Sequence, residues 1–276
     1  MTDNLNFGNP YKPENFWQLR EAVEGVAEAC RAFGTPVTGG NVSLYNESPA
    51  GVVDPTPTVG MVGLIDDERH ITTQWFKKAG DKIILVGEIG DELGGSQFLK
   101  VCHGRKEGPP PHLDLAHEIK IQNAVRDLIR EGLVKSAHDC SEGGLAIALA
   151  ECCFNPAGLS GAEVDLDGVE APLSGVSAAG NERVRTHATT AQILFNESQS
   201  RIVISVATEN LERTVSLLQE RELPHRQLGI VSGDELRVRA NDENFRWKMA
   251  DLYDDWFNAI RRAVENDSSA ERIPSL

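Results

Sequence analysis

Apolar residues recur at helical spacing early in the chain. The spacing holds from Pro13 to Gly34, and proline suits a first helical turn while glycine suits the residue after the last one. Residues 3–10 are crowded with amides and turn formers, which predicts an irregular segment. Residues 36–46 predict a strand, a glycine turn and a second strand, and residues 55–65 hold another strand.

A longer series of helices and strands is predicted in the rest of the chain. Helical patterns cover residues 114–131, 145–154, 209–222 and 248–264, and strand patterns cover 83–87, 162–166, 193–195, 202–206, 227–231 and 235–238. Residues 176–190, rich in small and polar side chains, predict a mobile insertion. The mixture predicts an α/β (α+β) fold with an N-terminal domain at 1–76, a larger domain at 77–265 and a disordered tail at 266–276.

Charge and cysteine content narrow the classes of partner. The formal net charge is −15, which repels phosphate backbones and anionic lipids, so we expect neither nucleic acid nor membrane as a partner. No apolar run approaches the roughly 20 residues that span a bilayer. Five cysteines without a CxxC pair predict reduced thiols in a cytoplasmic protein, and no histidine or cysteine spacing indicates zinc.

Three loops combine polar side chains with glycine, at residues 3–10, 39–43 and 138–144. Glycine lets backbone N–H groups close on an anion, and Asp and Asn oxygens are ligands that Mg²⁺ prefers. From the residues alone, a phosphate–magnesium site and plain structural turns are both open. The chain has neither GxxxxGK[ST] nor GxGxxG, which argues against P-loop and dinucleotide-binding folds. His138 and Cys140 are near neighbours in sequence, which is not enough to predict a catalytic dyad.

Six motifs occur in the order found in one enzyme family: DNLNFGNP, GNVSLYNE, PTPTVGMVG, ELGGS, SAHDCSEGG and FNES. Together they resemble the second half of phosphoribosylformylglycinamidine synthase, a relative of aminoimidazole ribonucleotide synthase, over residues 3–260. The resemblance implies a half-barrel mixed sheet with helices, followed by a larger α/β lobe.

The resemblance also implies a reaction. In this family ATP and Mg²⁺ drive the conversion of formylglycinamide ribonucleotide to the amidine, with ammonia from a glutaminase. The implied partners are the N-terminal half of the synthase, a glutaminase subunit and a small bridging subunit. Because the family's histidine base, ATP-binding lysine and acidic magnesium ligands belong to the first half, we expect this chain to be inactive alone.

Four residues match the family's binding positions in this half. Asp3 and Gly40 would contact ATP, Asn41 would bind magnesium, and Ser43 would contact the substrate. An extended Gly-Asn-x-Ser segment places Asn41 and Ser43 on one side. We further expect Asp3 to lie close to Asn41, so that the two side chains hold one magnesium-bound triphosphate.

A second group of residues matches metal- and substrate-binding positions of the family's first half. In this half the same positions imply either a pseudo-site, which in some relatives holds a structural nucleotide, or residues that maintain the fold. The residues are Asp139, Glu142, Glu197, Ser198 and Arg201.

Two other functions stay open. The chain could be another ligase or kinase of the same superfamily, or a non-catalytic nucleotide-binding or assembly module. An isolated half-barrel sheet is expected to expose an apolar face and an edge, which predicts homodimerisation through the N-terminal sheet.

Overall fold

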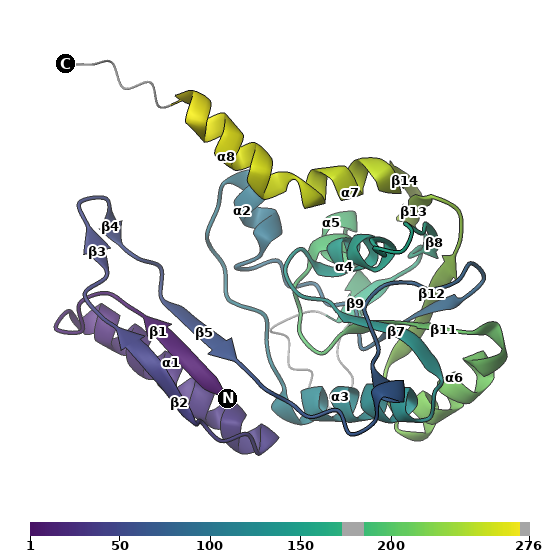
Figure 1. The fold of residues 1–276 in the computed structure, drawn as a ribbon, viewed down its shortest axis with the longest axis horizontal. Helices are drawn as coiled ribbons and strands as arrows, with labels where there is room; N and C mark the ends of the chain where they lie inside the picture. The colour runs from purple at the N-terminus through teal and green to yellow at the C-terminus, as the bar shows by residue number, and fades with distance from the viewer. Residues whose placement is uncertain (173–184, 271–276) are drawn as a thin grey trace. The chain divides into compact units, whose positions relative to one another are not determined.

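The computed structural model describes residues 1–172 and 185–270, and the chain divides into two compact units. The N-terminal unit is Met1–Arg69 and the C-terminal unit is His70–Leu276 (Figure 1). The division falls before the expected boundary at residue 76. The reason is Phe76, whose side chain is fully buried in the core of the C-terminal unit and whose backbone N–H donates to Cys152 O at 2.7 Å.

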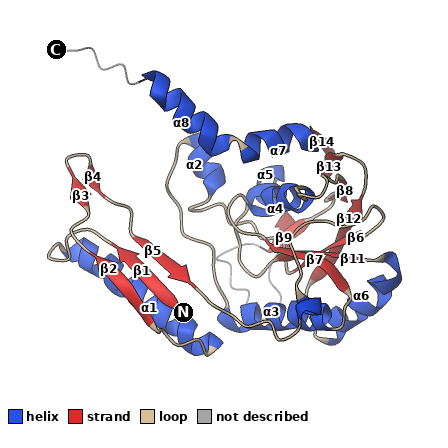
Figure 2. Ribbon diagram, viewed as in Figure 1, coloured by secondary structure: helices blue, strands red, loops and turns tan. Residues whose placement is uncertain are grey.

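The N-terminal unit contains a three-stranded sheet and one long helix (Figure 2). The strand order is β2-β1-β5, with β1 parallel to β2 and antiparallel to β5. The helix α1 begins at Pro13 and is closed by Gly34 in the left-handed conformation, as its apolar spacing predicts. The elements are β1 (Thr2–Asn6), α1 (Pro13–Phe33), β2 (Gly39–Ser43), β3 (Glu47–Ser48), β4 (Gly51–Val52), β5 (Thr56–Gly60) and the short 3₁₀ helix η1 (Glu68–His70).

Two predictions for this unit were wrong. The segment expected to be irregular forms β1, the central strand, because both of its edges are hydrogen-bonded and this outweighs the low strand propensity of asparagine. The expected glycine turn does not form either. Gly39 and Gly40 lie within β2, paired with Thr2 and Asp3.

The C-terminal unit is built on a seven-stranded sheet of order β14-β13-β8-β12-β6-β11-β7. All neighbours are antiparallel except β13 and β8. Five of its strands were predicted at their observed places, whereas β7 and β14 were not. The strands are β6 (Lys82–Val86), β7 (Val134–Asp139), β8 (Ala162–Asp165), β11 (Ile202–Val206), β12 (His225–Val231), β13 (Glu235–Ala240) and β14 (Glu243–Lys248).

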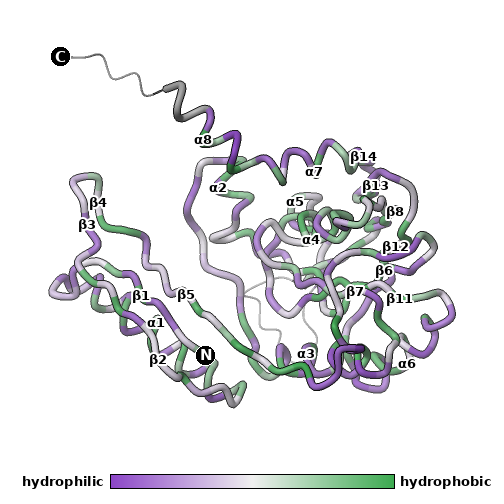
Figure 3. The backbone as a smooth tube through the Cα atoms, in the orientation of Figure 1, coloured by the Kyte–Doolittle hydropathy of each residue, from purple (hydrophilic) through white to green (hydrophobic). Residues whose placement is uncertain are grey.

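Both faces of this sheet are covered by helices (Figure 2). The alternation along β6 decides which core each side chain joins: Ile84 and Val86 pack with α3 and α6, whereas Ile83 and Leu85 pack with α4 and α5. In Figure 3 much of α4 is coloured as hydrophobic, as expected for a helix with a buried interior position. The helices are α2 (Gln97–His103), α3 (Leu115–Arg130), α4 (Gly144–Cys153), α5 (Thr190–Phe195), η2 (Thr208–Asn210), α6 (Leu211–Glu220), α7 (Met249–Phe257) and α8 (Ala259–Ala270).

Three predictions for the C-terminal unit need correction. Residues 193–195 form part of α5 instead of a strand, because Thr189 and Gln192 make a reciprocal capping box. The last helix breaks at Asn258, and α8 runs to Ala270, beyond the expected helix end at 264. Residues 271–276 of the expected tail lie outside the described residues. Of the expected insertion, residues 176–184 lie outside the described residues, and Arg185–His187 forms β10, paired with β9 (Glu170–Pro172).

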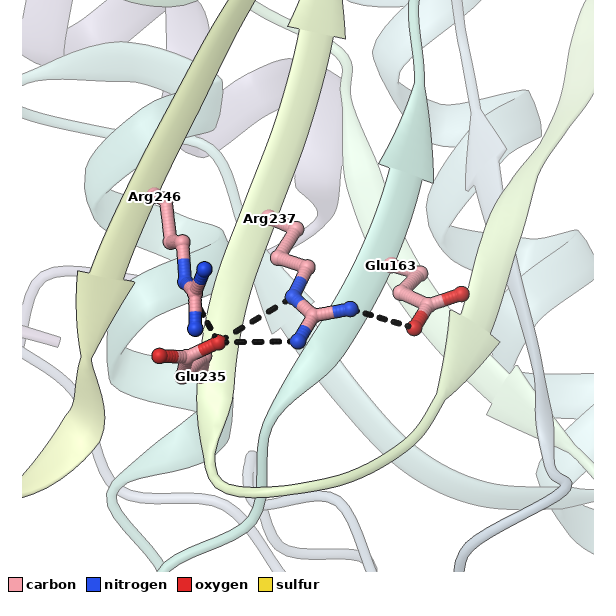
Figure 4. Close-up of polar contacts among 4 residues, drawn as sticks. All are labelled: Glu163, Glu235, Arg237 and Arg246. Carbon is pink, nitrogen blue, oxygen red and sulfur yellow. Dashed lines mark hydrogen bonds and ion pairs between the residues drawn. The ribbon is translucent and has the colours of Figure 1, made fainter.

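Charged side chains interleave across the end strands of the large sheet (Figure 4). On β13, Glu235 accepts hydrogen bonds from Arg246 of β14 at 2.7 Å and from Arg237 at 3.0 Å. Arg237 also reaches Glu163 of β8 at 3.4 Å. The Glu235 side chain is only 9% exposed. These bonds therefore tie the edge strand β14 to β13, and β13 to β8.

Candidate functional site

The predicted binding residues lie on β1 and β2, whose register decides which of them share a face. Asp3 pairs with Gly40, Asn4 with Asn41, and Asn6 with Ser43. Side chains alternate along a strand, so the pair Asp3 and Gly40 lies on one face of the sheet. The pairs Asn4 with Asn41 and Asn6 with Ser43 lie on the other face. Asn41 and Ser43 share a face, as their spacing predicts.

Asp3 lies on the face that also carries Leu5, which is 7% exposed. The helix α1 is the one long helix of this fully described unit, so α1 covers that face. A Cβ atom at Gly40 would clash with Asp3 Oδ1 and with Asp3 O. Glycine at position 40 therefore allows the Asp3 carboxylate to lie against the neighbouring strand.

The other face of this sheet, called the open face below, carries uncharged polar side chains. They come from all three strands: Asn4, Asn6, Asn41, Ser43, Thr56 and Thr58. Asn41 Nδ2 donates a hydrogen bond to Asn4 Oδ1 at 3.2 Å. With its nitrogen so engaged, Asn41 presents its Oδ1, the kind of oxygen that Mg²⁺ prefers.

The expectation that Asp3 and Asn41 jointly hold one triphosphate was wrong. The register pairs Asp3 with Gly40, one position before Asn41, so the two side chains leave the sheet on opposite faces. Asp3 and Gly40 are cross-strand neighbours on one face, whereas Asn41 and Ser43 lie two residues apart along β2 on the other face.

A corner after β2 positions Ser43, and its central residue, Asn46, was not predicted. Ser43 Oγ donates to Asn46 Oδ1 at 3.1 Å, while Asn46 Nδ2 donates to Ser43 O at 2.9 Å and to Phe7 O at 3.2 Å. Between them Tyr45 has φ 62°, a left-handed conformation that is uncommon for a bulky residue. The motif contained the signal, since an asparagine three residues after a strand serine is suited to closing such a corner.

The rest of the first motif builds the fold. Phe7 is fully buried, and a Cβ atom at Gly8 would clash with Val52 and Asn15. Glu47 accepts from Asn9 N at 2.9 Å and pairs with Lys12 Nζ at 2.8 Å, and the Lys12 bond lowers the pKa of Glu47. These contacts hold the segment that joins β1 to α1.

The second predicted group centres on Glu197. Its Oε1 accepts hydrogen bonds from the backbone N–H of Gln97, at the first turn of α2, and from that of Gly143, each at 2.8 Å. Three segments distant in sequence therefore meet at one carboxylate. Asp139 bonds to Ser141, and Glu142 is exposed.

Arg201 is buried beneath this group, at 2% exposure. Its Nε donates to Ser198 O at 2.9 Å and its Nη2 to Asn196 O at 2.7 Å. Among the described residues, Arg201 Nη1 and Ser198 Oγ have no hydrogen-bond partner. Burial lowers the pKa of Arg201. The two hydrogen bonds of Arg201 to Ser198 O and Asn196 O maintain the loop between α5 and β11, and its buried Nη1 is left as an unused donor group.

His138 forms an ionic bridge between β7 and α4. Its Nε2 lies 2.8 Å from Glu151 Oε2 and its Nδ1 lies 3.5 Å from Asp139 Oδ1. Burial alone would lower the pKa of His138, but the bonds to Asp139 and Glu151 raise it to about 9. Burial raises the pKa of the Cys140 thiol to about 11, which disfavours the thiolate that a nucleophile needs.

A cavity of about 420 Å³ lies elsewhere in the C-terminal unit, and no predicted site residue lines it. Two arginines in its wall are engaged by neighbouring acceptors. Arg185 pairs with Glu88 at 2.8 Å and donates to Glu170 O at 3.0 Å, while Arg226 donates to Asp167 O at 2.9 Å. We assign no ligand to this cavity.

The described residues bear on cofactors and membranes in two ways. In the described parts of the chain, no group of three or more His, Cys, Asp or Glu residues could hold a metal ion. The open face offers only amide and hydroxyl oxygens, so a magnesium ion at Asn41 would take its charged ligands from a bound phosphate or from residues outside this face. Within the same ranges, no helix has the length and apolar character needed to cross a membrane.

Comparisons with known proteins agree with this architecture. Residues 1–65 match the N-terminal domain, and residues 78–241 the C-terminal domain, of AIR synthase related proteins. The chain is 46% identical to a phosphoribosylformylglycinamidine synthase subunit PurL of Anaeromyxobacter sp. (strain Fw109-5), over 97% of this chain and 33% of that protein. It thus spans about one third of the length of the curated relatives it matches.

Solved structures show the same fold. A structure of Thermotoga maritima PurL complexed with FGAR superimposes with a TM-score of 0.65 at 17% identity, over 91% of this chain and 39% of that chain. A structure of the same protein complexed with ATP gives a TM-score of 0.61 at 17% identity, over 92% and 37% of the two chains. The chain therefore belongs to the family of AIR synthase related proteins, within which it resembles the PurL subunits of phosphoribosylformylglycinamidine synthase.

Proposed function

We propose that this chain supplies part of the active site of a phosphoribosylformylglycinamidine synthase, an ATP-dependent carbon–nitrogen ligase. The observation that carries the proposal is the placement of Asn41 and Ser43 side by side on an uncovered polar sheet face, in a chain 46% identical to a PurL subunit. The reaction converts formylglycinamide ribonucleotide (FGAR) to the amidine with ATP and glutamine-derived ammonia. Relatives of the same fold bind ATP and FGAR.

The four residues have separate roles in this proposal. Asp3 and Gly40 contact ATP where β1 and β2 begin, and the missing Cβ at position 40 leaves room there for the Asp3 carboxylate. Asn41 offers Oδ1 to magnesium, and Ser43 contacts FGAR. When bound, magnesium would neutralise charge on the transferring phosphoryl group. The chain's own contribution is positioning, since the open face carries no ionisable side chain that could move a proton.

The remaining machinery lies outside the residues of this sequence in this proposal. The first half of the synthase supplies the base and the acidic magnesium ligands, and a glutaminase subunit with a small bridging subunit delivers ammonia, in the cytoplasm. Homodimerisation through the N-terminal sheet stays a prediction, and a second copy that met the open face would meet uncharged polar side chains there. The exposed edges of β2 and β5 remain as surfaces for the first half or for a second copy.

The test compares the chain alone with a mixture of the chain and the first half of a PurL subunit. With FGAR, ATP, Mg²⁺ and ammonia, we expect the amidine in the mixture and not with the chain alone. Asn41→Ala should raise the Mg²⁺ concentration needed for half-maximal rate by about tenfold or more, whereas Thr58→Ala on the same face should change it little. Turnover by the chain alone at an ordinary enzyme rate, or an unchanged Mg²⁺ requirement, contradicts the proposal.

A second candidate function is nucleotide binding without catalysis, at the segments that meet around Glu197. The unused buried donor of Arg201 and the unpartnered Ser198 hydroxyl favour a ligand there, with Asp139 and Glu142 at its rim. Titration of the chain with ATP separates the two candidates. Loss of binding in Arg201→Lys, with Asn41→Ala unaffected, would favour the pseudo-site, and the reverse pattern would favour the open face.

A further inference from the structure

The orientation of the Asn46 amide is decided by its neighbours. Asn46 Nδ2 lies 2.9 Å from Ser43 O and 3.2 Å from Phe7 O, both carbonyl oxygens that can only accept hydrogen bonds. Rotating the amide by half a turn would place its own oxygen against these two acceptors with no proton between them. The nitrogen therefore points at the two carbonyls, and Oδ1 points at Ser43.

This orientation determines where the Ser43 proton lies. Asn46 Oδ1 is 3.1 Å from Ser43 Oγ, and an amide oxygen only accepts. Ser43 must therefore donate its single hydroxyl proton to Asn46. Ser43 Oγ can therefore offer a ligand only its two lone pairs, which accept hydrogen bonds.

The corner that holds this bond is well anchored. The backbone N–H of Asn46 donates to Phe7 O at 3.2 Å, and the N–H of Phe7 donates to Ser43 O at 3.0 Å. Phe7 is fully buried, and the N–H of Val53 donates to Asn46 O at 3.1 Å. Reversing the Ser43 hydroxyl would leave Asn46 Oδ1 without this donor, a cost that an acceptor on the ligand would have to offset.

We propose that Ser43 meets its ligand as a hydrogen-bond acceptor, so that the ligand group at Ser43 is an N–H or O–H donor and not a phosphate oxygen. The inference rests on the proposed function, in which Ser43 contacts FGAR. FGAR offers both chemistries, since it carries amide N–H groups, ribose hydroxyls and a phosphate. Lone pairs of Ser43 attract the donors and repel the phosphate, whose oxygens are acceptors near neutral pH.

The first measurement needs no ligand. Both Asn46 Nδ2 protons are hydrogen-bonded, so in NMR spectra of the full chain their exchange with water should be at least about tenfold slower than in the chain unfolded in urea. Exchange at the unfolded rate would show that the amide is not held and would overturn the inference, whatever the chain binds.

The second measurement uses FGAR and its dephosphorylated nucleoside as ligands. Ser43→Ala should weaken both by the same factor, about 3- to 10-fold, and Ser43→Thr, which keeps the hydroxyl, should bind both within about twofold of wild type. The Asn46 signals and the melting curve check that each variant folds. A loss confined to the phosphorylated ligand would place the phosphate at Ser43 and overturn the inference.

Two other outcomes separate this inference from the proposed function. If Ser43→Ala binds FGAR as tightly as wild type, the inference fails while FGAR binding by the chain stands. If wild type responds to neither ligand although the Asn46 amide is protected, the proposed role of Ser43 fails and the ligand assignment fails with it.

Discussion

The two units of this protein differ in how their sheets are covered. In the C-terminal unit, helices pack on both faces of a seven-stranded sheet, and strand β6 is buried on both sides. In the N-terminal unit, a three-stranded sheet has α1 on one face and polar side chains on the other. Leu5 and Phe7 are its buried hydrophobic residues. The larger unit has the core of an independently stable domain, and the smaller one has far less.

The N-terminal unit, which has the smaller core, is also the one that carries the proposed binding residues. A face without a helix leaves Asn41 and Ser43 accessible, which a two-sided core would not. The same unit exposes large apolar side chains, among them Phe16 and Trp17 on α1. The stretch after β5, coloured as hydrophobic in Figure 3, adds Met61, Val62, Leu64 and Ile65, all more than half exposed. Surfaces of this kind are typical of an interface with another polypeptide, in keeping with the proposed partnership.

The largest expected effect comes from removing a core side chain of the C-terminal unit. Phe76→Ala deletes a fully buried ring and should lower the free energy of unfolding by about 3–5 kcal/mol. Chemical denaturation followed by circular dichroism measures it. Phe16→Ala, at a position 55% exposed, is the matched control and should cost about 1 kcal/mol or less. Equal losses in the two variants would contradict the assignment of the core.

The corresponding change in the N-terminal unit should act locally. Phe7→Ala removes a buried ring from a core with few other members, and we expect a loss of about 3 kcal/mol because the site can partly collapse. Hydrogen exchange should show faster opening in β1, β2 and β5, while the seven-stranded sheet keeps its protection. Faster exchange throughout the chain would show that the two units unfold as one.

A pH dependence of stability between pH 6.5 and about 9 should belong to the C-terminal unit, because all seven histidines follow residue 69. The pKa of His138 is raised from 6.5 to about 9, so the folded state holds the proton more tightly. The stabilisation is complete below pH 6.5 and is lost as the pH rises through 9, by an amount on the order of 2 kcal/mol. Denaturation at pH 6, 7.5 and 9.5 measures it. His138→Gln should flatten this dependence, and the exposed His187→Gln should leave it intact.

The smallest effect is expected at the edge strand β14. Bonds from Arg246 and Arg237 lower the pKa of Glu235, so their stabilisation is present above its ordinary value of 4.5 and is lost as the pH falls below it. Arg246→Gln should lower the melting temperature slightly at pH 7 and lose that difference in strong acid. Asn244→Ala, on the same face of β14, is the control. A difference between wild type and Arg246→Gln that persists at pH 2 would rule out this bridge.

Much of the fold could be predicted from local pattern. The apolar spacing of α1 with its closing glycine, the N-cap Asp114 of α3 and the continuous apolar run of β6 each specify an element through contacts within a few residues. The motifs likewise led to the family, and they are the basis for proposing Asp3, Gly40, Asn41 and Ser43 as binding residues. Elements with weak local signals were missed or mistaken, as with the asparagine-rich β1 and the short helix α5.

The chemistry of the site depended on contacts between distant segments. That Asp3 faces away from Asn41 follows from a one-residue difference in strand register, which hydrogen bonds between residues 37 positions apart establish. That Ser43 gives its proton to Asn46 follows from the Phe7 carbonyl, 39 positions from Asn46 along the chain. Local spacing identifies which side chains a strand presents, because its period is two. Which partner each side chain meets, and with which atom, depends on the neighbouring strands and is settled when they pair.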